Sequence, residues 1–173
     1  MNIDWNIVSN WTAVITACVA ILGLILQSKT TKFTLDVDLL VRLEDKFDEE
    51  AMLVIRKKAA RALLLGNNLD VAGDVFDFFE TMGLLLRKGA LDQEMATNEF
   101  SYWAVSYWMA GQKYIKQVRS KDPNYWINYE RLVNIMNKTN KRSYKSSLYV
   151  LSKEEVREFL EVESKLAIGK SGK

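Results

Sequence analysis

A run of 24 residues without a formal charge, from Trp5 to Ser28, is the feature that most limits how this chain can fold. Most residues between Ile7 and Leu26 are Val, Ile, Leu, Ala, Thr or Gly. A helix rises about 1.5 Å per residue and the hydrocarbon layer of a bilayer is about 30 Å thick, so about 20 apolar residues are enough to cross it. We therefore expect residues 1–28 to form an N-terminal transmembrane anchor.

The residues that flank this run favour an anchor that is not cleaved. A signal peptide has a basic start, an apolar core of about 7 to 15 residues and a cleavage site of small residues. Here residues 1–6 contain Asp4 and no Lys or Arg, and the apolar stretch is longer than such a core. A signal peptide and a buried core helix remain the alternatives.

Basic residues near the span predict its direction. Lys29 and Lys32 follow the run and no Lys or Arg precedes it. Because cytoplasmic flanks carry the excess of positive charge, we expect a single-pass protein of the inner (cytoplasmic) membrane, with its N-terminus outside and its C-terminal domain in the cytosol. Cys18, the one cysteine, lies in the middle of the run, so no intramolecular disulfide can form.

Small and hydroxyl-bearing residues recur every three or four positions along the predicted span. On a helix they share one side, which we call the contact stripe, and such a stripe lets two spans approach closely. We expect it to support homo-oligomerisation, although single-pass anchors also contain such residues without any partner. The contact stripe consists of Ser9, Thr12, Thr16, Ala20 and Gly23.

An amphipathic pattern follows the span directly. Apolar residues three or four apart predict one buried helix face, and no Gly or Pro lies between Gly23 and Asp48. This helix can therefore continue the transmembrane helix into the cytosol as a stalk that holds the domain close to the membrane. The predicted buried face consists of Phe33, Val37, Leu40, Leu43 and Phe47.

The rest of the chain is predicted to be all-α. Pro123 is the one proline in 173 residues, and proline is the commonest helix breaker. We expect an irregular antiparallel bundle of about five helices in residues 29–142, and a connector, a C-terminal helix and a frayed tail in residues 143–173.

Local signals predict where several helices begin. Asp48 and Asp92 can each cap a helix N-terminus, and the pair Asp122-Pro123 has an N-cap residue followed by proline. Ser152 with Glu155 forms a capping-box pattern before a final helix.

Several motifs in the middle of the chain resemble a known family. The run from Asp77 to Asp92 is followed by Phe100 to Trp103, by Tyr107-Trp108 and by Asp122-Pro123. Together they resemble a family of small, mostly bacterial proteins of unknown function, and the resemblance extends from about Phe33 to Met136. It implies one N-terminal span and an all-helical domain, and it brings no catalytic or ligand-binding residues with it.

The residue types available argue against an enzyme. The chain has no histidine and no phosphate-binding glycine loop, and Cys18 is expected to lie in lipid. Asp70, Asp74 and Asp77 share one predicted helix face, and Glu80 lies three residues further on. Asp74, Asp77 and Glu80 are therefore weak candidates for a metal or catalytic site. The alternative is a solvated face or ion pairs with Arg56 or Arg61 of a neighbouring helix, and no cofactor is expected.

Basic residues form two clusters that are either solvated helix faces or contacts to anionic lipid headgroups. The first cluster contains Arg56, Lys57, Lys58 and Arg61. Nucleic-acid binding is not expected, because the 24 basic residues are nearly balanced by 22 acidic ones. In addition, the aromatic residues have the spacing of a buried helix face. The candidate headgroup contacts are Lys29, Lys32, Lys138, Lys141, Arg142 and Lys145.

These observations favour a non-enzymatic, membrane-anchored helical module that binds a protein partner or self-associates at the cytosolic membrane face. One alternative is a membrane-acting stress or phage-defence effector that oligomerises and perturbs the bilayer. A second is a carboxylate-based enzyme.

Overall fold

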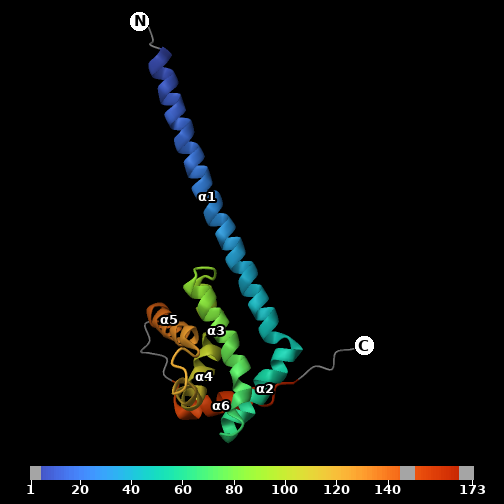
Figure 1. Cartoon of the computed structure of the whole chain (residues 1–173). Helices are drawn as coiled ribbons and strands as arrows, with labels where there is room; N and C mark the ends of the chain where they lie inside the picture. Colours follow the sequence, from blue (N-terminus) through green and yellow to red (C-terminus); the bar gives the residue numbers. More distant parts are fainter. Residues whose placement is uncertain (1–4, 145–150, 168–173) are drawn as a thin grey trace. The chain divides into compact units, whose positions relative to one another are not determined.

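The computed structural model describes the backbone of residues 5–144 and 151–167, and within these ranges it leaves out the side chains of residues 5–20, 22–25, 29 and 141–144. The described residues form α-helices and one short 3-10 helix, with no strand among them, so the predicted all-α class is confirmed (Figure 1). The elements are α1 (Trp5–Asp48), α2 (Glu50–Leu65), η1 (Leu69–Ala72), α3 (Gly73–Arg87), α4 (Gln93–Arg119), α5 (Ile127–Tyr144) and α6 (Lys153–Glu163).

Among the residues that the structure describes, no helix has both the length and the apolar character needed to cross a bilayer. The predicted anchor, residues 1–28, falls mostly on positions whose side chains lie outside the description.

The chain divides into two compact units, Met1–Asp38 and Leu39–Lys173. The described part of the first unit is a single helix, the N-terminal part of α1, and a lone helix has no core of its own. The second unit contains the last turns of α1 and all the other helices. Its core contains Leu43 and Phe47 from α1. The last turns of α1 therefore belong to the bundle of the second unit, whereas the preceding part of α1 belongs to the first unit.

Aromatic side chains dominate the core of the second unit. α3 is apolar on most of its circumference and pairs most extensively with α5, while α4 packs on α5 and α6. Phe47 contacts the rings of Phe78, Phe100 and Trp103, and Tyr129 stacks on Phe79 at 5.2 Å between ring centroids. Because large rings bury much apolar area, these contacts organise the packing of α1, α3, α4 and α5.

Glycines allow two helix pairs to approach closely. A Cβ added at Gly83 of α3 would lie 2.2 Å from the carbonyl oxygen of Asn128 in α5, and one added at Gly111 of α4 would lie 2.3 Å from Cζ of Phe76 in α3. Any other residue at these positions would force the neighbouring atoms to move.

Two predicted helix starts are confirmed. The Asp92 side chain accepts a hydrogen bond from the N–H of Met95 at the start of α4, at 2.9 Å. At the start of α6, Ser152 and Glu155 form the complete capping box. Both signals depend only on residues within one helical turn, which explains why the sequence reveals them.

Two other predicted caps are wrong. Asp48 is the last residue of α1, and the residue that precedes α2 is Glu49, although the helix begins at Glu50, close to the predicted start. The pair Asp122-Pro123 forms a turn instead of a helix start, because the Asp122 carboxylate accepts a hydrogen bond from the N–H of Asn124 at 3.0 Å. Trp126 then has φ 51, which is not helical, so α5 starts at Ile127.

Candidate functional site

The contact stripe lies on α1, which is helical without interruption from Trp5 to Asp48. Residues three and four apart on a helix share one face, so the backbone places the five stripe positions on one side of α1. The side chains of Ser9, Thr12, Thr16, Ala20 and Gly23 lie outside the described residues.

The candidate headgroup contacts are described only in part. Lys32 of α1 and Lys138 of α5 are exposed. The side chains of Lys29, Lys141 and Arg142, and the whole of Lys145, lie outside the described residues.

Arg56 fits neither interpretation of the first basic cluster, a solvated helix face or a contact to lipid headgroups. Its side chain is 3% exposed, and it forms a two-pronged ion pair with Glu163 of α6. The Nη2–Oε1 distance is 2.7 Å and the Nε–Oε2 distance is 2.9 Å. The chain separation of 107 residues explains why no local pattern reveals this pair.

Neighbouring residues form hydrogen bonds with the remaining donors and acceptors of this ion pair. The Tyr107 hydroxyl of α4 lies 2.8 Å from Oε2 of Glu163 and donates a hydrogen bond to it. Nη1 of Arg56 donates to the carbonyl oxygen of Phe47, and the guanidinium lies 3.9 Å from the Phe47 ring centroid. The network therefore joins the end of α1 to α2, α4 and α6. Nη1 of Arg56 also forms an ion pair at 3.3 Å with Asp48, whose side chain is 76% exposed. Removing Glu163 would leave this exposed carboxylate as the ionic partner of the buried guanidinium.

Burial and charge act on the pKa values of this network. Burial raises the pKa of the Tyr107 phenol well above its usual value, and the Glu163 charge adds to this rise. For Arg56, burial acts to lower the pKa, but the hydrogen bonds and the charge of Glu163 outweigh it, so the pKa is raised. Near neutral pH the network thus contains a charged guanidinium and a neutral phenol, and its contacts hold the helices together.

The acidic residues of α3 contact hydrogen-bond donors on α5 and on the turn before it. The carboxylate of Asp77 accepts a hydrogen bond from Nε1 of Trp126 at 2.7 Å. Glu80 accepts from Nδ2 of Asn128 at 2.6 Å and from the N–H of Tyr129 at 2.7 Å. A carboxylate at a helix N-terminus satisfies free N–H groups and the helix dipole, so Glu80 caps α5 from a distance.

The other two acidic candidates are placed apart from these contacts. Asp70 of η1 accepts a hydrogen bond from the Tyr114 hydroxyl at 2.8 Å. Burial, together with this hydrogen bond, raises the pKa of Tyr114 to about 12. Asp74 is exposed. Within the described part of the chain, no three His, Cys, Asp or Glu residues lie close enough to hold a metal ion. The ion pairs expected with Arg56 or Arg61 are replaced by bonds to neutral donors, which charge patterning does not reveal.

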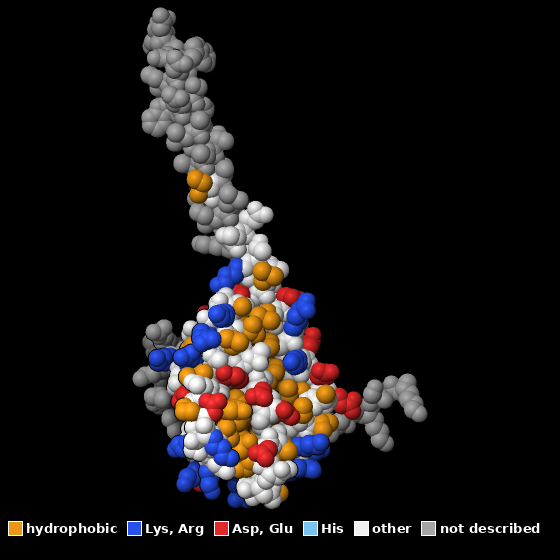
Figure 2. All heavy atoms as spheres, viewed as in Figure 1, with side chains coloured by type: hydrophobic (Ala, Val, Ile, Leu, Met, Phe, Trp, Pro, Cys, Tyr) orange, Lys and Arg blue, Asp and Glu red, His pale blue; other side chains and the backbone are white. Residues whose placement is uncertain are grey.

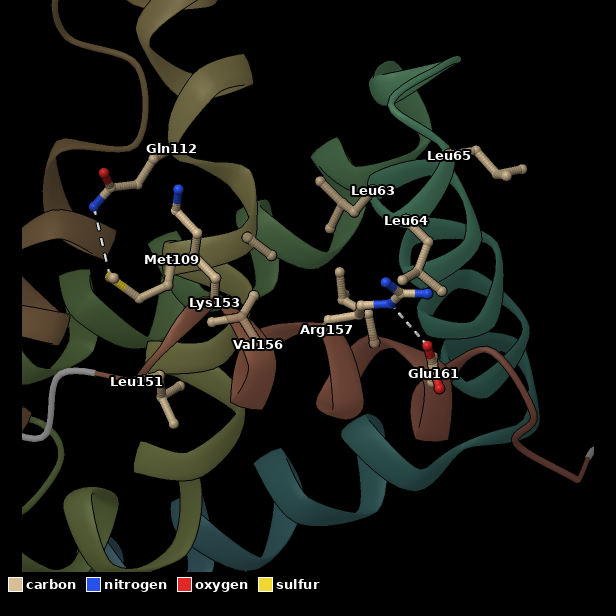
Figure 3. A pocket seen from close by; sticks show the side chains of 12 residues that line it. Leu63, Leu64, Leu65, Met109, Gln112, Leu151, Lys153, Val156, Arg157 and Glu161 are labelled. Atoms are coloured by element: carbon tan, nitrogen blue, oxygen red, sulfur yellow. Dashed lines mark hydrogen bonds and ion pairs between the residues drawn. The ribbon is translucent and has the colours of Figure 1, made fainter.

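A groove of about 840 Å³ lies between the end of α2, the middle of α4 and α6 (Figure 3). Leu63 and Leu64 form one side, and Val156 lies across from them on α6. The charges on its rim include Arg157 and Glu161, which form an ion pair at 3.0 Å. The groove thus combines an apolar lining with charged and polar side chains, which also include Lys153 and Gln112.

Charges of both signs lie on the visible face of the bundle. Figure 2 shows Lys and Arg side chains mixed with Asp and Glu, with apolar atoms between them. Because the charges are mixed, this face lacks the uniform positive potential that would attract a polyanion strongly.

A family model described as a domain of unknown function, DUF4760, matches residues 10–136. The matched range begins within α1 and ends within α5, so α6 and its Glu163 lie beyond it. The resemblance to a family of unknown function is thus confirmed. No curated protein and no solved structure matches the chain.

Proposed function

The chain belongs to the DUF4760 family of unknown function, and we propose that it is a single-pass, membrane-anchored interaction module. In this proposal the uncharged run from Trp5 to Ser28 crosses the membrane with its N-terminus outside. The helical bundle is held at the cytosolic face, and the module self-associates through the contact stripe. The membrane part of the proposal is supported by the length of the uncharged run and by the position of Lys29 and Lys32 after it.

The continuity of α1 is the observation that carries this proposal. One helix contains the uncharged run and also buries Leu43 and Phe47 in the core of the bundle. The uncharged run and these two core residues therefore belong to one continuous helix. The family match begins at Asn10, which makes most of the run part of the matched domain.

The proposal includes no catalysis. The chain has no histidine, and Asp77, Glu80 and Glu163 accept hydrogen bonds that join helices. Side chains used in this way stabilise the bundle, which supports a structural role for them.

Membrane attachment and orientation can be tested on the full chain. We expect it to stay in the membrane pellet after an alkaline carbonate wash, whereas residues 29–173 should be soluble. In a Cys18→Ser background, a membrane-impermeant thiol reagent added to intact cells should label Asn2→Cys, and should label Lys173→Cys only after permeabilisation. Release of the full chain by carbonate would refute the anchor, and the opposite labelling pattern would refute the orientation.

Self-association through the contact stripe has its own test. Thr16→Leu and Gly23→Leu add bulk on the stripe, and we expect each to convert an oligomer into monomers in detergent or nanodiscs. Ala17→Leu is the matched control, because Ala17 is also small but lies about 100° around the helix from Thr16. A wild-type chain that is already monomeric would contradict this part of the proposal.

A further inference from the structure

Beyond the contact stripe, α1 has a repeat of seven residues. Its positions alternate in steps of four and three, and all lie within one uninterrupted helix. A spacing of about 3.5 residues keeps one side of a helix facing a partner when two helices supercoil. These positions, which we call the stalk seam, are Leu26, Thr30, Phe33 and Val37.

The stalk seam is apolar and largely exposed at its start. Leu26 is 65% exposed and Phe33 is 61% exposed. The Thr30 hydroxyl donates a hydrogen bond to the carbonyl oxygen of Leu26 at 3.0 Å. Because this hydroxyl is satisfied within the helix, Thr30 can enter an apolar contact without losing a hydrogen bond.

The seam continues the contact stripe in the same register. Going back from Leu26, steps of three and four lead to Gly23, Val19, Thr16, Thr12 and Ser9. Four of these five positions belong to the contact stripe, which was defined from small residues alone. Large apolar residues of the stalk and small residues of the predicted span thus share one face of α1.

We propose that Leu26 to Val37 of two copies of this chain form a parallel, two-stranded coiled coil that continues the contact between their spans. This inference rests on the proposed function, because two chains anchored in one membrane with the same orientation have their stalks parallel and in register. Each seam residue of one copy then contacts the same residue of the other copy.

The residue types along the seam fit two strands. Leu26 and Phe33 occupy the d positions, and the β-branched Thr30 and Val37 occupy the a positions, which favours parallel dimers. The next position of the repeat is Leu40, which already packs against the core of its own bundle. The coiled coil therefore ends near Val37. It is shorter than the three to four heptads of a typical coiled coil, so it needs the spans to hold it together.

Two exposed residues give a matched test. Phe33 lies on the seam and Leu35 lies about 200° around the helix from it, yet each is 61% exposed. In a Cys18→Ser background, Phe33→Cys and Leu35→Cys would be oxidised in native membranes. A disulfide needs Cβ atoms about 4 Å apart, which a seam position offers and the opposite face does not. We expect at least about tenfold more cross-linked dimer at residue 33 than at residue 35.

The outcomes separate this inference from the proposed function. Equal cross-linking at residues 33 and 35, or none at residue 33 in a chain that is membrane-bound and oligomeric, would overturn the coiled coil and leave the anchored module standing. Loss of membrane attachment would refute the anchor instead. As a check without cysteine, Phe33→Glu should reduce the fraction of oligomer and Leu35→Glu should leave it unchanged. The same loss in both variants would also count against the seam.

Discussion

Arg56 shows how strongly a single buried charge can depend on one distant partner. Its guanidinium is 3% exposed and Glu163, its partner, is 5% exposed at the side chain. Taking both charges out of water costs free energy that only good geometry and further hydrogen bonds repay. Tyr107 and the Phe47 carbonyl supply those bonds. The network therefore makes α6, which lies beyond the family match, a structural part of the bundle.

Replacing Glu163 tests this role. We expect Glu163→Gln to lower the free energy of unfolding by about 3 to 5 kcal/mol. It leaves Arg56 charged and buried, with the exposed Asp48 as its remaining ionic partner. Glu161→Gln on the same helix is the control. It removes an ion pair with an exposed residue, Arg157, and should cost less than about 1 kcal/mol. Denaturant unfolding of the full chain in detergent, followed by circular dichroism, would measure both. Equal losses would show that Arg56 does not depend on Glu163.

At the scale of elements, the pairing of α3 with α5 depends on contacts that allow the two backbones to lie close together. Gly83 lets the carbonyl of Asn128 approach α3. One turn away, Glu80 accepts hydrogen bonds from Asn128 and Tyr129 at the start of α5. A small residue and a capping carboxylate on one helix therefore position the N-terminus of the other.

Gly83→Ala tests the close approach. Its Cβ would lie 2.2 Å from a backbone oxygen, so α5 must shift, and this strain should outweigh the better helix propensity of alanine. We expect a loss of stability of about 1 to 3 kcal/mol. Gly73→Ala is the control, because its nearest neighbour is 4.0 Å away, and it should be neutral or more stable by up to about 1 kcal/mol. Thermal and denaturant unfolding would compare the two variants, and a neutral Gly83→Ala would contradict the tight packing.

At the scale of the whole molecule, the division into two units separates folding from self-association. The second unit, Leu39–Lys173, contains the aromatic core and the buried Arg56 network. The described part of the first unit is one helix, which gains stability only through contacts along its faces. The bundle can therefore fold by itself, whereas the proposed contacts between copies lie along α1.

Removal of residues 1–28 tests this separation. We expect residues 29–173 to be helical, to unfold cooperatively and to be monomeric, because the remaining stalk seam is too short to hold two copies together. Circular dichroism would measure helicity and cooperative unfolding, and analytical ultracentrifugation would measure mass. A stable dimer of residues 29–173 would show that the bundle, and not the spans, provides the main contact between copies.

Local signals account for the helices that could be predicted from sequence. Asp92 and the pair Ser152 and Glu155 act within one turn, so their caps could be read directly. The start predicted at Asp122 failed because a competing bond to the N–H of Asn124 closes a turn. The acidic candidates could be placed on one predicted face, but their partners, Trp126 and Asn128, could not be identified, because they come from another part of the chain.

The sequence by itself determined the all-helical class and several helix starts, because helix periodicity and capping depend on residues three or four positions apart. It also supplied the uncharged run and the repeat along α1, on which both proposals rest. Only the tertiary structure decided which charged residues are buried. Arg56 and Glu163 are 107 residues apart, and Glu80 and Asn128 are 48 residues apart. Whether such a pair meets depends on how whole helices pack, and no local pattern contains that information.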